Sequence, residues 1–405
     1  MYILYLGVIL LIGFFLSLLA GKLGFPKIMG YLVAGLLLNP EIVSFIPEDF
    51  NSIAEPVTNF CLAFITFEIG SSFSILELKT TGKKFFKLAF FESFGAFLLI
   101  FGAFLIISYT ILPISAEGIP ILIAFSILLA SLAAPTDPSA TLAVIHEYKA
   151  KGPVTNSILG AAAFDDIITL ILFSFSFSIS KALVGSDEMS VIHIIYTIFY
   201  QIIGAILTGY IIGLIFNKIN VAFKINNKKS LIILFLGFLS LTFGLATFFK
   251  FDELFSTLTL GFIIRNYNKN YDKILDITET EMEDLFFLVF FVLSAMQFNL
   301  DGFSLYLLLL IFVFILIRGL GKYVGMFIGT RLLKMPVTVQ KYAFAGLIPQ
   351  GGIVLGLALM ISKNPEFDAF SNILTGIIMG ATILHEFIGP VIARKVLKSA
   401  KEIKL

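Results

Sequence analysis

The chain has 405 residues, of which 58% are hydrophobic and 14% are charged, and its formal net charge is +1. This composition excludes a water-soluble globular domain, and the near-neutral charge gives no support for a nucleic-acid partner. A single cysteine, Cys61, excludes a disulfide framework and a thiolate metal site. We therefore expect a polytopic membrane protein surrounded by membrane lipid.

Thirteen apolar segments follow one another along the chain, and most approach the roughly twenty residues that cross about 30 Å of hydrocarbon. They cover residues 2–20, 26–40, 57–76, 86–111, 118–145, 154–180, 191–216, 230–249, 253–265, 284–300, 304–331, 340–362 and 369–392. We therefore predict an all-α fold of about thirteen transmembrane helices. Because thirteen is odd, the two termini should lie on opposite sides of the membrane.

Basic residues are distributed very unevenly between the loops. Of the 28 lysines and arginines, 23 fall in loops that follow odd-numbered segments. Lys181, Lys250 and Lys363 lie on the other side, and Arg318 and Lys322 lie within the eleventh segment. By the positive-inside rule, the N-terminus is expected outside the cell membrane and the C-terminus in the cytoplasm.

Two segments carry internal prolines, the fifth (LLASLAAPTDPSATLAV) and the twelfth (FAGLIPQGGIVLGLALM). One proline is easily a tolerated kink, but two interrupted segments seven spans apart indicate a repeat. Because seven is odd, the two halves would have opposite orientations. We predict one transporter domain over 1–405, with inverted repeats at roughly 1–180 and 230–395 and a connector helix at 191–216.

In the fifth segment, Pro135 and Pro138 bracket Thr136 and Asp137. Proline removes a backbone donor and disfavours helix at the residue before it, so the helix should unwind here. Free carbonyls at the ends of the half-helices could then coordinate a cation. Asp137 is either a cation ligand or a cap on an exposed helix end. In the twelfth segment, the amide of Gln350 could substitute for a cationic charge compensator.

The sixth segment contains two adjacent carboxylates, Asp165 and Asp166. One aspartate at the centre of a membrane helix costs roughly 2.5–3.5 kcal/mol, so a merely structural helix would not keep two. Adjacent residues point about 100° apart, and we expect the pair to have different roles. Arg318 is the candidate partner for one of them, because its guanidinium is bidentate and permanently charged. Lys322, one turn further on, is interpreted as a snorkelling side chain or an accessory group.

Several other polar residues within the segments are interpreted as helix-contact or interfacial groups, with Glu68 as a candidate accessory residue of the site. They are Glu68, Glu92, His193, Gln297, His385 and Glu386. The chain has no phosphate-binding G-x-x-x-x-G-K-[ST] motif. An intramembrane aspartyl protease needs two carboxylates from separate helices, and adjacent residues have the wrong geometry. We therefore expect neither an enzyme nor a cofactor.

The stretch from Ser131 to Ile168 resembles the core of the monovalent cation/proton antiporter superfamily, which includes the sodium/proton exchangers. Other pieces match its motifs in the same order, namely FPKIMGYLVAGLLLNP, FEIG, TDPSATLAVIHE, FDD, RGLGKYVG and GLIPQGGIVLGLA. The resemblance implies that Asp166 is the ion-binding and proton-binding carboxylate and that Asp165 is paired with Arg318. It also implies that the two interrupted helices cross, with Thr136 and Asp137 at the crossing, and that the protein is a homodimer.

Two features depart from the family's pattern. Electroneutral members of the family typically carry an Asn-Asp pair with a Glu a few residues earlier. This chain has Asp165 at the position of the Asn and Ala161 at the position of the Glu. The aspartate-pair branch usually has Lys where this chain has Arg318. Because an arginine does not release its proton in the working pH range, the charge stoichiometry does not follow from the resemblance.

The expected function is secondary antiport of Na+ (or Li+) for H+ across the cytoplasmic membrane, with a role in pH homeostasis. Asp137, Asp165 and Asp166 are the expected ligands of Na+, near Thr136, and the cation and protons would compete for them with alternating access. A K+/H+ antiporter or a gated K+ pathway of the same fold is an alternative. A sodium-coupled organic-anion symporter is the third reading, although it would not need two adjacent aspartates opposite an arginine.

Overall fold

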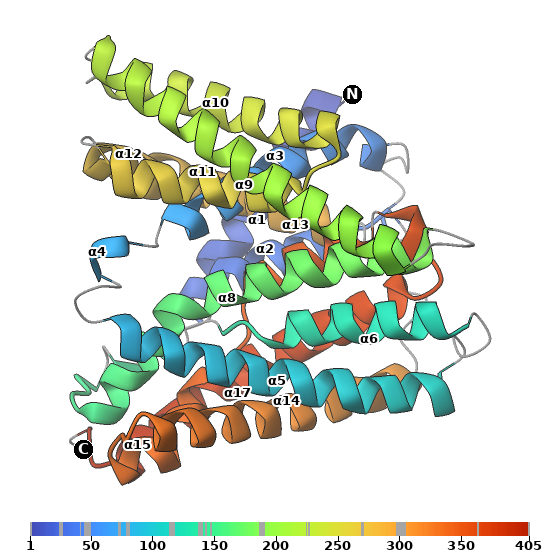
Figure 1. Ribbon diagram of the computed structural model, residues 1–405, viewed down its shortest axis with the longest axis vertical. Helices are drawn as coiled ribbons and strands as arrows, with labels where there is room; N and C mark the ends of the chain where they lie inside the picture. Colours follow the sequence, from blue (N-terminus) through green and yellow to red (C-terminus); the bar gives the residue numbers. More distant parts are fainter. Residues whose placement is uncertain are drawn as a thin grey trace. The chain divides into compact units, whose positions relative to one another are not determined.

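A computed structural model describes the chain apart from residues 1, 24–26, 41, 44–49, 72–73, 78–81, 113–117, 137–140, 142–143, 146–147, 186–190, 224, 226, 269–270, 297–304, 363 and 404–405. Throughout the described residues the ordered elements are helices, which confirms the predicted all-α fold class (Figure 1). Each of the thirteen predicted segments contains a helix. Within the described ranges, six helices are long and apolar enough to cross a membrane. The total of thirteen crossings stays a prediction.

Residues 1–75 and 196–300 form one compact unit, which we call the first unit. Its helices are α1 (Tyr2–Lys22), α2 (Lys27–Leu37), α3 (Phe50–Ser71), most of α9 (Val191–Ala222), α10 (Lys228–Phe249), α11 (Glu253–Tyr267), α12 (Tyr271–Ile277), the π-helix η3 (Thr278–Met282) and α13 (Glu283–Met296). A short helix, α4 (Ile75–Glu77), begins at its boundary.

The first unit is held together where α3 packs against α11 and α13. A Cβ atom on Gly70 would lie 1.9 Å from the carbonyl oxygen of Leu258, so only glycine permits this approach of α3 and α11. Around the crossing, Phe64 and Phe67 of α3 pack against Phe235 of α10 in a buried aromatic cluster. Apolar packing therefore dominates this unit.

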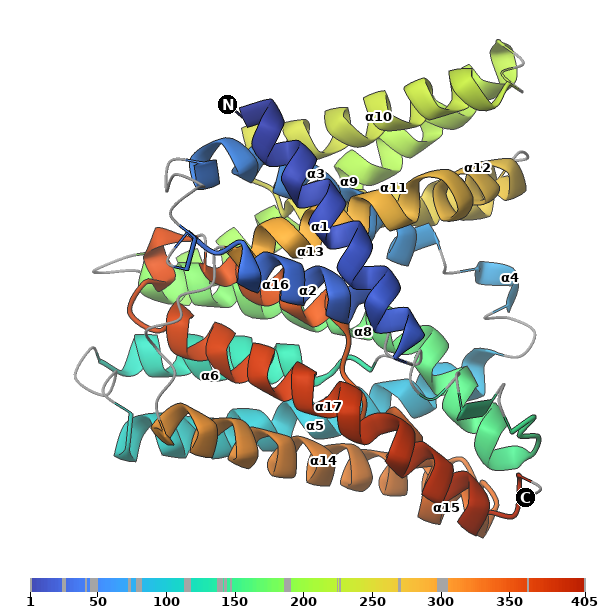
Figure 2. The same cartoon turned by 180° about the vertical axis from the view of Figure 1, so that it is seen from behind.

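Residues 76–195 and 301–405 form the second unit. Its helices are α5 (Lys83–Thr110), α6 (Ile119–Ala133), α8 (Pro153–Val184), α14 (Leu305–Leu332), α15 (Val337–Tyr342), the 3-10 helix η4 (Ala343–Leu347), α16 (Gly352–Ser362), the 3-10 helix η5 (Pro365–Phe367) and α17 (Ser371–Ser399). Helix α5 packs against α6, α8 and α14. Figures 1 and 2 show α5 and α14 running side by side along their length.

Glycines bring α5 and α14 unusually close together. A Cβ atom on Gly325 would lie 2.2 Å from the carbonyl oxygen of Phe91, and one on Gly95 would lie 2.6 Å from that of Gly321. Small residues let membrane helices approach until their backbones touch. The close approach fixes which side chains of α5 and α14 face each other, and it positions the site described below.

Both predicted helix interruptions are confirmed. Helix α6 ends at Ala133, and the chain from Ala134 to Thr136 is not helical, because Pro135 cannot supply the backbone donor that continues a helix. In the twelfth segment the 3-10 helix η4 ends at Leu347, and residues 348–351 are not helical before α16 begins. The other bracketing proline, Pro138, lies outside the described residues.

Both units combine an early part of the chain with a late part. The first unit joins residues 1–75 to 196–300, and the second joins 76–195 to 301–405. Each interrupted segment belongs to the second unit. The inverted repeats and the connector at 191–216 stay a prediction.

Candidate functional site

The two interrupted segments meet inside the second unit. The hydroxyl of Thr136 donates to the carbonyl of Leu347 over 3.1 Å, and the hydroxyl of Thr141 donates to the carbonyl of Gly346 over 2.8 Å. These bonds join the end of the first interruption to η4 in the second. The expected crossing of two broken helices is therefore present, with Thr136 at it. Asp137, expected beside Thr136, lies outside the described residues.

The broken end of α6 exposes backbone carbonyls that a continuous helix would have satisfied. These acceptors carry the partial negative charge of a helix C-terminus, which cations stabilise. Side-chain donors from elsewhere in the second unit take up four consecutive carbonyls. Gln350 Nε2 donates to Leu132 (2.6 Å), Arg318 Nε to Ala133 (2.8 Å), Lys322 Nζ to Ala134 (2.8 Å) and Arg318 Nη2 to Pro135 (2.6 Å).

Arg318 binds to both interruptions at once. Besides the carbonyls of Ala133 and Pro135, its Nη1 donates to the carbonyl of Ile348. The side chain is fully buried on α14. Its planar array of donors suits diverging carbonyls at two unwound helix ends. Arg318 and Gln350 therefore both bind backbone carbonyls at the broken helices, while their part in charge compensation and transport stays a prediction.

The expected pairing of Asp165 with Arg318 is corrected by the structure, because Lys322 is the base beside this carboxylate. Lys322 Nζ lies 3.7 Å from Asp165 Oδ2, and it hydrogen-bonds Glu92 Oε1 and, over 2.7 Å, Thr136 Oγ1. The lysine is fully buried and has polar partners on every N–H, so the snorkelling interpretation is wrong. Both bases lie on one face of α14 one turn apart, and the helix approach decides which reaches α8.

The two adjacent aspartates of α8 have different surroundings, as their spacing predicts. Asp165 is 1% exposed, and its Oδ1 accepts a hydrogen bond from the hydroxyl of Ser93 on α5. Its Oδ2 is buried and accepts no hydrogen bond from the described residues. Asp166 is partly exposed. One carboxylate is thus tied to the charged cluster, and the other is more accessible.

Sequence reasoning gave little weight to two residues of this cluster. The sequence pattern indicates only a contact group at Glu92 and gives no indication for Ser93, yet Glu92 is fully buried against Lys322 and Ser93 binds Asp165. The available signal was the coincidence of one acid and one lysine within separate apolar spans, since buried charges need partners. Glu68 lies on α3 in the first unit and stays a predicted accessory residue.

Among the remaining polar candidates, His385 of α17 is buried in the second unit. The side chains of His193, Gln297 and Glu386 lie outside those described. No group of three or more His, Cys, Asp or Glu residues suited to a metal ion occurs in the described part of the chain. The expected Na+ ligand set also includes Asp137, which is not in that part, so the set stays a prediction.

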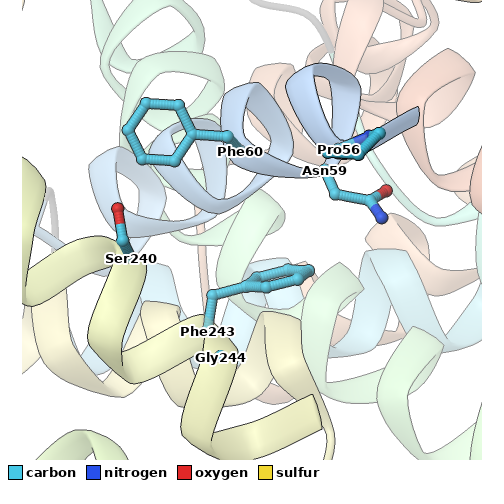
Figure 3. A pocket seen from close by; sticks show the side chains of 6 residues that line it. All are labelled: Pro56, Asn59, Phe60, Ser240, Phe243 and Gly244. Carbon is cyan, nitrogen blue, oxygen red and sulfur yellow. The ribbon is translucent and has the colours of Figure 1, made fainter. Parts of the chain in front are cut away.

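A cavity of about 370 Å³ lies elsewhere, within the first unit, between α3 and α10 (Figure 3). Among the described residues its lining contains no charged side chain and consists of Pro56, Asn59, Phe60, Ser240, Phe243 and Gly244. A desolvated cation needs carboxylate or several carbonyl oxygens. This cavity therefore lacks the chemistry of the expected ion site.

Known proteins resemble this chain over most of its length. The family model described as "Sodium/hydrogen exchanger, transmembrane" matches residues 7–395. The Na(+)/H(+) antiporter NhaP of Pseudomonas aeruginosa is 24% identical over 289 residues, which are 67% of this chain and 66% of that relative, just under two thirds of its length. The solved structure of the sodium proton antiporter MjNhaP1 from Methanocaldococcus jannaschii at pH 8 gives a TM-score of 0.72, at 23% identity and 98% coverage of both chains. That likeness shows a shared fold.

Proposed function

Because the chain belongs to the sodium/hydrogen exchanger family, which confirms the resemblance of its motifs, we propose that it exchanges Na+ (or Li+) for H+ across the cytoplasmic membrane. The protein is a multi-pass membrane protein. The names of the bacterial relative and of the archaeal structural neighbour support the proposal, since both are sodium/proton antiporters. We further propose a homodimer with its N-terminus outside and its C-terminus in the cytoplasm.

The observation that carries the proposal is the buried cluster where the two broken helices cross. It holds a carboxylate, Asp165, whose Oδ2 accepts no hydrogen bond from the residues that the structure describes, next to the more exposed Asp166. A carboxylate oxygen with an unused lone pair can take a proton or a small cation, but not both together. We propose that Na+ and H+ compete for these two aspartates, with Asp137 and Thr136 completing the site.

Arg318 has a different role in the proposed exchange. Its donors are taken up by the carbonyls of Ala133, Pro135 and Ile348, and its charge is permanent. It therefore stabilises the two unwound ends in every step and carries no proton. Gln350 assists at the carbonyl of Leu132. Alternating exposure of the aspartates to the two sides would complete the cycle without ATP.

The decisive experiment measures proton flux in proteoliposomes under an imposed pH gradient after adding Na+, Li+ or K+. Asp166→Asn removes the carboxylate and should abolish cation-driven flux. Asp276→Asn makes the same chemical change at an exposed position of α12 and should leave the flux unchanged. Cation-driven flux that persists in Asp166→Asn would contradict the role given to this residue.

The same assay separates the alternatives. Flux driven by K+ alone would favour the K+/H+ antiporter or the gated K+ pathway. Absence of flux with every monovalent cation would favour the organic-anion symporter. Repeating the measurement with the membrane potential clamped or free would give the charge moved per cycle, because an electrogenic exchange responds to potential and an electroneutral one does not.

A further inference from the structure

One lysine of the second unit, Lys322, lies near two buried carboxylates, Glu92 and Asp165, but hydrogen-bonds only the first. Lys322 Nζ forms a direct hydrogen bond with Glu92 Oε1 but lies 3.7 Å from Asp165 Oδ2, which is too far for a hydrogen bond. All three side chains are 1% exposed or less. Because these side chains are buried, each charge is stabilised by its partners within the cluster and not by water.

The donors of Lys322 account for the inequality. An ammonium group has three N–H donors. They are taken by Glu92 Oε1, by the carbonyl of Ala134 and by Thr136 Oγ1. None remains for Asp165, so this carboxylate can gain a hydrogen bond from the lysine only if one of those partners is released. Glu92 is the charged member of the three and holds the ammonium most strongly.

Ser93 completes the arrangement from the same helix as Glu92. Its hydroxyl donates to Asp165 Oδ1 and also lies 3.4 Å from Glu92 Oε2. A hydroxyl has one proton to donate, and here the closer acceptor is Asp165. One oxygen of Asp165 is thereby anchored, and the other, Oδ2, is buried without a donor in the described part of the chain.

We propose that Glu92 is a positioning residue that retains Lys322 and so keeps Asp165 Oδ2 open for the transported ion. This inference rests on the function proposed above and adds to it the group that controls access to the carboxylate. Lys322 is paired with Glu92, and Arg318 donates to backbone carbonyls, so neither of these two bases donates a hydrogen bond to Asp165. The charge of Asp165 is then left for a monovalent cation or a proton.

Loss of the charge on Glu92 would change this balance. Among the described residues, the nearest anion to Lys322 would become Asp165, and closing the gap from 3.7 Å to a normal hydrogen bond of about 2.8 Å needs a shift of about 1 Å. The glycine contacts between α5 and α14 hold the backbones of Glu92 and Lys322 in place, so a side-chain movement suffices. Na+ would then have to displace a buried ammonium from Asp165.

The first test is the half-saturating Na+ concentration for proton flux in proteoliposomes containing the full-length chain. Glu92→Gln is expected to raise it by about tenfold, equivalent to about 1.4 kcal/mol, with the maximal rate largely kept. Glu92→Asp keeps the charge on a shorter side chain and should give a smaller rise. A merely structural role would lower the maximal rate or the folded fraction without this selective change.

Rescue is the sharper test. In the double variant with Glu92→Gln and Lys322→Gln, no ammonium can close on Asp165, and the half-saturating Na+ concentration should return to within about threefold of wild type, a difference of under about 0.7 kcal/mol. Na+-dependent thermal stabilisation in detergent should be reduced in Glu92→Gln and restored in the double variant. This measurement does not depend on transport. Unchanged Na+ dependence in Glu92→Gln, or a double variant no better than the single one, would overturn the proposal.

Each remaining outcome is also informative. Glu92→Gln leaves a buried lysine without its anion and could fail to fold, in which case Glu92→Asp and the double variant decide. The proposal then requires a higher half-saturating Na+ concentration in Glu92→Asp than in the double variant. The reverse order contradicts it. Wild-type protein without cation-driven flux refutes the proposed function itself, whereas normal wild-type flux with unaffected variants refutes only the role of Glu92.

Discussion

The two units solve one packing problem with opposite chemistry. In the first unit, α3 and α11 approach through Gly70, and a hydroxyl pair, Thr66 with Thr257 at 2.6 Å, lies in their interface. In the second unit, α5 and α14 approach through Gly325, but the pair in the interface is Glu92 with Lys322. One crossing buries neutral groups and aromatic rings, and the other buries charges.

The difference separates a crossing that stabilises the fold from a crossing that keeps buried charges at a cost in stability. Neutral hydroxyls satisfy each other at little cost, and rings around them supply apolar burial. Buried charges in a membrane segment are expensive and persist only when they are fully partnered. A crossing that keeps them next to two broken helices is suited to binding ions, whereas the neutral crossing is suited to serving as a scaffold.

The largest expected effect comes from removing the base that binds both interruptions. Arg318→Gln replaces three donor nitrogens by one and would leave one or two of the carbonyls of Ala133, Pro135 and Ile348 without a donor. At about 1–3 kcal/mol for each unsatisfied buried group, the loss of unfolding free energy should reach about 3 kcal/mol. Unfolding in mixed micelles measures it. Arg318→Lys keeps the charge but not the fork and should fall between, and a loss below about 1 kcal/mol would contradict the capping role.

The next prediction applies the same steric change to both crossings. A Cβ atom would lie 2.2 Å from the Phe91 carbonyl oxygen in Gly325→Ala and 2.1 Å from the Phe67 carbonyl oxygen in Gly261→Ala. Each substitution should lower the unfolding free energy by about 1–3 kcal/mol, because backbones must separate. Only Gly325→Ala should also raise the half-saturating Na+ concentration, since it moves Glu92 away from Lys322. Equal effects of both variants on Na+ dependence would remove the distinction between the units.

Much of the fold could be predicted, because hydrophobic length and proline have direct structural consequences. The apolar runs predict helices, and Pro135 predicts the end of α6. Polar helical turns were missed where hydropathy carries no signal. Helix α3 begins at Phe50 rather than at residue 57, and α12 with η3 occupies a polar stretch at 271–282.

The site was predicted in its parts but not in its pairing. Asp165 and Arg318 stand out in the sequence because charges in apolar runs are rare. Choosing between two bases one turn apart, Arg318 and Lys322, requires knowing how closely α5 approaches α14, which depends on contacts between residues over two hundred positions apart. For the same reason Glu92 had no visible partner. Spacing within one segment cannot supply this information.

A smaller effect is expected at the start of α8, the helix that carries the aspartate pair. The carboxylate of Glu402 accepts hydrogen bonds of 2.7 Å from the backbone amides of Val154 and Thr155 and from the Thr155 hydroxyl. In the first unit, Asp252 caps α11 from its own N-terminus by accepting from Phe255. Loss of either cap should cost about 0.5–2 kcal/mol of unfolding free energy.

The two caps differ in what they hold. Glu402→Ala should also raise hydrogen exchange at the amides of Val154 and Thr155, because the far end of the chain supplies the acceptor there. Asp252→Ala should raise exchange only within the first turn of α11. Exchange that is unchanged at Val154 in Glu402→Ala would show that the end of the chain does not stabilise the start of α8.

The smallest effect is expected at the neutral crossing. Thr66→Val removes one hydroxyl of the 2.6 Å pair, and Thr257 can still donate to the carbonyls of Glu253 or Leu254 in its own helix. Hydrogen bonds between membrane helices average about 0.6 kcal/mol, so the unfolding free energy should fall by less than about 1 kcal/mol, with Na+ dependence unchanged. A double-mutant cycle with Thr257→Val isolates the pair. A coupling of about 2 kcal/mol or more would mean that the neutral crossing depends on its polar pair as strongly as the charged crossing depends on the Glu92–Lys322 pair. The two crossings would then differ only in the charge of the groups they bury.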